Sequence, residues 1–216
     1  KYFMGLVEWI LDNDYASKIE LQLTTNGTKL NKTLIEKLLK FKKVKLLLSI
    51  DGTGKVYDYI RHHASWEKTY GNLKLLTKNP NIQLQVALVA SFYNVTNIFD
   101  LIEQCRKIGV SVYTDQDLKP ENSEISPRNT DSNIRSILNK QADKIEKKYT
   151  TNSLVDFHAR NSAKALRNIA TGSTVAPNIK SRLIKTLQIQ DRLYKTDYRD
   201  FLQIEQIEYL ERIHNE

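Results

Sequence analysis

Two apolar segments of this sequence end in the same kind of polar tip that contains glycine. The stretch IELQLTTNGT begins at Ile19, and the stretch KLLLSIDGTG begins at Lys45. Asn-Gly or Asp-Gly between alternating apolar runs usually indicates a β-hairpin. Here, however, a helical spacing of apolar residues follows each tip; these are Leu34, Ile35, Leu38, Leu39 and Phe41 after the first, and Trp66, Tyr70, Leu73 and Leu76 after the second. We therefore predict two strand-to-helix loops, which in α/β folds lie at the carboxyl ends of parallel strands, where ligands bind.

The same alternation extends over residues 1–113 and predicts an α/β fold. The expected strands are Ile19–Thr24, Val44–Ile50, Ile82–Val89 and Val110–Tyr113, and the expected helices lie around residues 3–11, 34–41, 65–78 and 96–109. Strands that alternate with helices predict a parallel sheet or a partial barrel with right-handed crossovers. Because the first unit begins with a helix and lacks the strand before it, we expect that Lys1 is not the natural start of the protein.

The pattern changes after Tyr113. A polar segment with two prolines, over about residues 114–130, is predicted to be a linker, and residues 131–216 are predicted to be helical only. The expected helices there are residues 133–147, 154–170, 178–194 and 198–213. The chain is thus divided into an α/β part, a linker and a helical region.

Composition limits the classes of protein that this chain can belong to. With 216 residues and 40% hydrophobic content, it can bury one sizeable core, and no apolar run is long enough to span a bilayer. Cys105 is the only cysteine, so a disulfide within the chain is excluded and an intracellular, cytoplasmic protein is the simplest interpretation. The net charge of +8 comes largely from lysines on the polar faces of helices. These lysines indicate either a solvated surface or an acidic partner such as nucleic acid, although no RNA-binding aromatic signature or helix-turn-helix pattern is present.

The polar residues of the tips are the candidate ligand-binding residues. Thr24, Thr25 and Asn26 follow the first strand, and Ser49 and Asp51 end the second. Their hydroxyl, amide and carboxylate groups could bind a ribose or an amino-acid moiety. The alternative is that they are ordinary turn residues, since Asn, Asp, Ser and Gly are the commonest turn formers. The third strand also ends in a polar stretch, ASFYNVTN, and three tips of one type favour a ligand site.

Four further residues carry potential chemistry. Arg61, where the second loop meets its helix, could clamp a carboxylate or be an ordinary surface residue. His62 and His63 are adjacent, so on a helix they would point about 100° apart, and we expect solvent or packing roles rather than a shared metal. Cys105 lies within a predicted helix, where a buried and inert thiol is expected. One cysteine with scattered histidines cannot make a structural zinc site.

Taken in order, the segments TTNGT, VKLLLSIDGTGKVYDYIR, SWEKTYGNLKLL and VALVASFYNVTNIFDLI resemble the core of the radical S-adenosylmethionine (radical SAM) enzymes, and in particular the twitch/SPASM group. The ending LQIQDRLYKTDYRDF is similar to the C-terminal helices of that group. The resemblance covers residues 3–113 and, more weakly, the last forty or so. It implies a partial (β/α)6 barrel in which Asn26, Ser49, Asp51, Arg61 and Asn94 line or support the S-adenosylmethionine pocket.

The resemblance also implies cofactors that this chain does not hold by itself. The family binds a [4Fe–4S] cluster through a CxxxCxxC motif and the methionine amino group through a GGEP-like motif, and neither is present here. Because thiolates hold such clusters, the chain would be the C-terminal part of a parent enzyme, with both motifs upstream of Lys1. The parent would take an electron from a donor, cleave S-adenosylmethionine to a 5′-deoxyadenosyl radical and modify a peptide or another intracellular substrate. The alternative is a non-enzymatic module whose basic surface binds an acidic partner such as nucleic acid.

Overall fold

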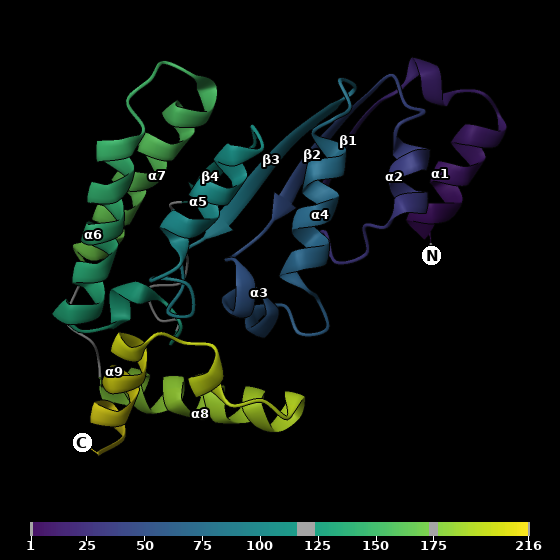
Figure 1. The fold of residues 1–216 in the computed structure, drawn as a ribbon. Helices are drawn as coiled ribbons and strands as arrows, with labels where there is room; N and C mark the ends of the chain where they lie inside the picture. The colour runs from purple at the N-terminus through teal and green to yellow at the C-terminus, as the bar shows by residue number, and fades with distance from the viewer. Residues whose placement is uncertain (1, 116–123, 173–176, 216) are drawn as a thin grey trace.

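A computed structural model describes residues 2–115, 124–172 and 177–215 (Figure 1). The first half alternates helices and strands in the order α1 (Tyr2–Asp12), a 3-10 turn η1 (Ala16–Lys18), β1 (Glu20–Thr25), α2 (Lys32–Leu38), β2 (Lys43–Ser49), α3 (Gly54–Ile60), α4 (Trp66–Leu76), β3 (Ile82–Val89), α5 (Ile98–Lys107) and β4 (Ser111–Asp115). The second half contains η2 (Pro127–Asn129), α6 (Ser132–Lys148), α7 (Leu154–Ala170), α8 (Pro177–Tyr194), η3 (Tyr198–Asp200) and α9 (Ile204–Asn215). The predicted α/β class is confirmed.

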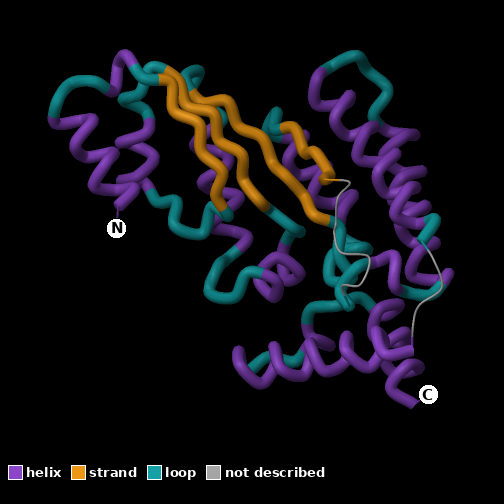
Figure 2. Tube along the Cα trace, turned by 180° about the vertical axis from the view of Figure 1, so that it is seen from behind, coloured by secondary structure: helices purple, strands orange, loops and turns teal. Residues whose placement is uncertain are grey.

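The four strands form one sheet in the order β1-β2-β3-β4, and every neighbouring pair is parallel. The register places Leu21 beside Val44, and Val44 beside Ile82. Each connection steps to the next strand in the same direction, so right-handed crossovers carry the connecting helices to one face of the sheet. Helices α2, α4 and α5 lie on that face in Figure 1. Figure 2 shows the opposite face, and no described helix lies across it.

The burial pattern follows from this one-sided arrangement. On β2, Val44, Leu46 and Leu48 are buried beneath the helices, whereas the alternate positions are half-buried or exposed. A strand in a parallel sheet covered on both faces would be apolar at nearly every position. We call the uncovered surface the open face; its residues Gln22, Thr24, Lys45, Gln83, Gln85 and Tyr113 are exposed. The far edge of β4 is covered instead by α7, where the backbone N–H of Thr114 donates to the Ser162 hydroxyl at 3.2 Å.

Several predicted boundaries need correction. The sequence predicts one helix between the second and third strands, but the structure has two, because α3 forms within the tip sequence before Ser65 begins α4 by accepting a bond from the Lys68 N–H. The predicted final helix is also interrupted. Phe201 stacks on Tyr59 and ends η3, and the Gln206 side chain accepts the Gln203 N–H where α9 begins.

The predicted linker stays a prediction, because its middle is not described. Residues 116–123 lie outside the described residues. Within the predicted linker, Thr114 and Asp115 extend β4, and residues 127–129 form η2. Among the described residues, none of the helices combines the length and the apolarity that crossing a membrane requires.

Candidate functional site at the carboxyl ends of the strands

Asp51 is the centre of a hydrogen-bonded group where β2 and β3 end. The Arg61 Nη2 donates to Asp51 Oδ2 at 2.6 Å, and the Val89 backbone N–H donates to Asp51 Oδ1 at 3.2 Å. The side chains of Arg61 and Asp51 are 27% and 13% exposed, so the ion pair is largely screened from water. Arg61 reaches Asp51 because α3 turns the chain back over the tip, and the sequence did not predict that helix.

The side chain of Asn94 links the tips of β2 and β3. It is fully buried. The amide Nδ2 donates to the carbonyl oxygens of Asp51 and Val89, both at 2.8 Å, and Oδ1 accepts the Ser91 N–H at 2.8 Å. Both amide hydrogens are therefore used within the protein. The residue supports the Asp51 group and is not available to contact a ligand.

A second cross-loop bond was not predicted. Asn97 Oδ1 accepts the backbone N–H of Thr53 at 2.6 Å and lies 3.2 Å from the Thr53 hydroxyl. Gly52 permits this approach, because a Cβ atom there would lie 3.0 Å from Asn97 Oδ1 and 3.1 Å from Val56 Cγ1. The asparagine within the polar ending of the third strand was the available signal, but sequence spacing does not reveal which loop it contacts.

The tip of β1 is built differently. Asn26 is exposed, and its Oδ1 accepts the N–H and the hydroxyl of Thr28 at 3.2 and 2.8 Å. Gly27 has a φ of +71°, which favours glycine. This is a local turn closed by its own side chains. No described hydrogen bond joins Asn26 to Asp51.

Ser49 lies at the end of the open face. It is half-buried and pairs in register with Ala87, which in turn pairs with Tyr113. Ser49 and Ala87 both have small side chains, and the exposed Tyr113 lies next to Ala87 in this row. The structure thus brings Asp51, Arg61 and Asn94 together, places Ser49 two residues before Asp51 on the same strand end, and leaves Asn26 at the next tip.

The C-terminal helices are fastened to the loops at this edge of the sheet (Figure 1). Asp191 on α8 accepts bonds from the Tyr59 hydroxyl at 3.1 Å, from the Thr196 hydroxyl at 2.9 Å and from the Tyr198 N–H at 3.1 Å. Burial and the charge of Asp191 raise the pKa of Tyr59, and burial raises the pKa of Tyr93 to about 12. Both phenols stay protonated and act as donors at neutral pH.

The two adjacent histidines also contact α8. His62 stacks on Tyr194, with 3.9 Å between ring centroids, and lies 3.8 Å from the ring of His63. His63 has a φ of +67°, so the pair is in a turn and not on a helix. Desolvation and the neighbouring His63 lower the pKa of His62. His62 therefore packs against another ring, which is one of the two roles that we expected. The rings of His62 and His63 contact each other, whereas on a helix they would point apart.

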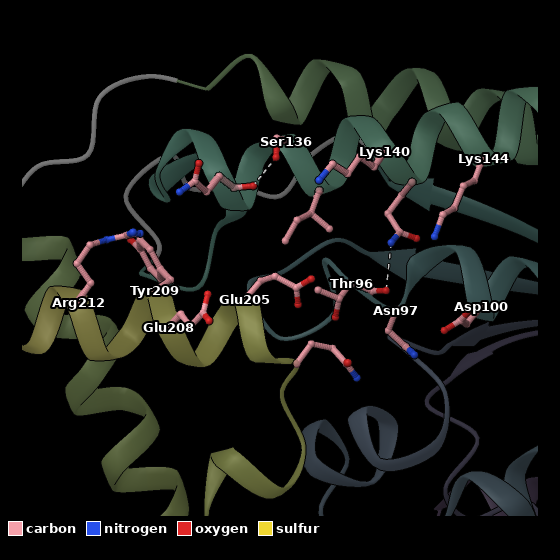
Figure 3. A pocket seen from close by; sticks show the side chains of 14 residues that line it. Thr96, Asn97, Asp100, Ser136, Lys140, Lys144, Glu205, Glu208, Tyr209 and Arg212 are labelled. Atoms are coloured by element: carbon pink, nitrogen blue, oxygen red, sulfur yellow. Dashed lines mark hydrogen bonds between the residues drawn. The ribbon is translucent and has the colours of Figure 1, made fainter.

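A polar pocket with a volume of about 530 Å³ lies between the β3–α5 loop and helices α6 and α9 (Figure 3). Thr96 and Asn97 form one wall, Lys140 and Lys144 on α6 a second, and Glu205, Glu208 and Arg212 on α9 a third. Gln141 bridges the walls, because its Nε2 donates to the Thr96 carbonyl at 3.1 Å and its Oε1 accepts the Phe99 N–H at 2.9 Å. Charges of both signs face this pocket, and its lining was not predicted from the sequence.

Metal binding has little support within the described part of the chain. Cys105 is buried, as predicted, and burial raises the pKa of its thiol to about 12, so a thiolate is strongly disfavoured. Among the described residues, no group of three or more His, Cys, Asp and Glu side chains is placed to hold a metal ion.

Comparisons with known proteins add no family assignment. The sequence matches no protein-family model, and a search of curated proteins returns no significant match.

Proposed function

We propose that the chain is the C-terminal part of a radical SAM enzyme, and that its strand ends supply one side of an S-adenosylmethionine pocket. The observation that carries the proposal is the one-sided sheet. Four parallel strands in sequential order, with helices on a single face, are what a sector of a (β/α) barrel would have. A doubly wound sheet would instead reverse its strand order and carry helices on both faces.

The chemistry of the tips supports this proposal. In barrel enzymes the ligand lies at the carboxyl ends of the strands, where the Asp51 group and Ser49 are found. A carboxylate and a hydroxyl can accept from or donate to the hydroxyls of a ribose. Arg61 Nε is buried without a hydrogen-bond partner among the described residues, so one donor of the guanidinium is not used within the chain.

The chain's residues fit S-adenosylmethionine but not an iron–sulfur cluster. One buried cysteine with a raised thiol pKa cannot supply the thiolates that a [4Fe–4S] cluster requires. In the proposal the cluster ligands belong to another region of a longer parent protein. The cofactor there would supply the radical chemistry, and the present residues would bind and orient S-adenosylmethionine beside the open face.

The first test is the open reading frame that encodes this chain. The proposal expects it to continue upstream of Lys1 through a CxxxCxxC motif and a GGEP-like motif, with an intact mass that matches the longer protein. A native protein without upstream cysteines would overturn the proposal.

The second test measures binding directly on the chain. We expect S-adenosylmethionine to shift the backbone amide signals of Ser49–Gly52 and Ser91–Asn94 in heteronuclear NMR spectra. Ser49→Ala should weaken these shifts, whereas Ser136→Ala, a change of the same kind in the polar pocket, should not. Shifts confined to the polar pocket would contradict the proposed location.

A further inference from the structure

We propose that a corner at the amino end of the sheet binds single-stranded nucleic acid, independently of the site at the carboxyl ends. We call it the basic corner and define it by aromatic and basic residues that are all exposed except the half-buried Lys43: Trp9, Tyr15, Lys18, Lys40, Lys42, Lys43 and Lys78. These residues come from the last turn of α1, from η1 and the residue before it, from the turns before β2 and β3, and from the first residue of β2. Figure 1 shows the amino ends of β1 and β2 close to the turn after α1.

Backbone hydrogen bonds hold the parts of the basic corner together. The N–H of Lys42 donates to the Ala16 carbonyl at 3.0 Å, which fixes η1 against the turn before β2. The N–H of Val44 donates to the Asn81 carbonyl at 2.8 Å, which brings the turn after α4 to the same place. The lysines are therefore gathered by the fold from three separate segments, and not by one charged run.

Two aromatic side chains at the basic corner are unusually exposed. Trp9 is 56% exposed and Tyr15 is 45% exposed, and their ring centroids are 5.7 Å apart. Each ring contacts the other but leaves much of its surface in water. Exposed aromatic faces beside a basic surface are the elements that bind single strands, because every base can stack on an aromatic ring while lysines neutralise phosphates.

The charge balance at the basic corner favours a polyanion. The same segments carry five lysines and three carboxylates, those of Asp12, Asp14 and Glu20. Among the residues that the structure describes, only Glu20 pairs with one of these lysines, at 3.9 Å from Lys42, and both side chains are more than half exposed. Such a pair contributes little and exchanges readily with a phosphate. The exposed Lys45 and Gln83 extend the polar surface from the basic corner onto the open face.

A single strand fits this surface better than a duplex or an acidic peptide. Duplexes keep their base faces stacked inside, so Trp9 and Tyr15 would have nothing to stack on. An acidic peptide would meet the lysines but would leave the aromatic pair unused. The proposed ligand is therefore single-stranded RNA or DNA without strong sequence preference.

The test is fluorescence anisotropy with a labelled oligo(U) of about 15 nucleotides, titrated at several salt concentrations. We expect Lys40→Gln, Lys42→Gln and Lys43→Gln together to make the slope of log K against log[salt] shallower by about 2, since each phosphate contact contributes about 0.7. Trp9→Ala should weaken binding by roughly tenfold. The matched control is Lys140→Gln, Lys144→Gln and Lys147→Gln on α6, which removes the same charge from another exposed face and should change the slope by much less.

Tryptophan emission gives an independent readout. The chain has two tryptophans, and Trp66 is buried between Tyr57 and Tyr70, so a change in emission on adding oligo(U) reports Trp9. Quenching that disappears in Trp9→Phe supports the proposal. Equal loss of affinity in the two triple variants, unchanged emission, or equal competition by polyglutamate would overturn it, because each outcome indicates general attraction of anions.

Discussion

The tips after β1 and β2 have similar sequences but are held in different ways. Asn26 and Gly27 form a turn whose side-chain bonds all go to residues within the turn. In the second tip, Asp51 accepts bonds from Arg61, which follows α3, and from the Val89 N–H on β3, and Gly52 lies against Asn97. Polar tip residues are therefore not equivalent. The first tip can change without disturbing its neighbours, whereas the second tip couples two strand ends and a helix.

Removing the buried side-chain amide of Asn94 should give the largest difference in stability between the two tips. Asn94→Ala would leave the carbonyls of Asp51 and Val89 and the Ser91 N–H without partners in a buried site. We expect a loss of about 2–4 kcal/mol in the free energy of unfolding, measured by urea denaturation. Asn26→Ala, at the exposed tip, should change it by less than about 1 kcal/mol. Similar losses for the two variants would show that the tips are held alike.

The close approach at Gly52 gives the next largest effect. A Cβ atom at this position would press on Asn97 Oδ1 and on Val56 Cγ1, so Gly52→Ala should cost about 1–3 kcal/mol in the same measurement. If Asn97 is the obstacle, the cost should shrink when Gly52→Ala is made in an Asn97→Ala background. An unchanged cost in the double variant would assign the effect to Val56 alone.

The next prediction concerns the energy of a single interaction at the second tip, the Asp51–Arg61 ion pair. A double-mutant cycle with Asp51→Asn and Arg61→Gln should give a coupling energy of about 1–2 kcal/mol, because the pair is largely buried and makes a short bond. The exposed pair between Asp197 and Arg199 is the control, with an expected coupling of about 0–1 kcal/mol. Equal couplings would show that burial at the tip adds nothing.

These differences explain what could be read from the sequence. The parallel strands and most of the helices were predictable, because apolar spacing and polar tips are local signals. Helix α3 was not, since its residues Val56, Tyr57 and Tyr59 are buried only through packing that forms in the folded protein. The Asn94 and Asn97 bonds cross between loops, and a single sequence carries no signal of such partners. The basic corner also depends on three segments meeting, so its lysines resembled scattered surface charges.

The smallest expected effect concerns pH at the contact between His62 and Tyr194. Desolvation and His63 lower the pKa of His62, so the folded state binds a proton less readily than the unfolded chain, whose histidine pKa is about 6.5. Stability should therefore decline as the pH falls below about 6.5, where only the unfolded chain takes up the proton. His62→Asn should flatten this decline between about pH 7 and pH 5, measured as the midpoint of thermal unfolding. His214→Asn, at an exposed position near the end of α9, should leave the decline unchanged. If both variants flatten it equally, the decline is a property of overall charge and not of the stacked rings that fasten α8 to the strand-end loops.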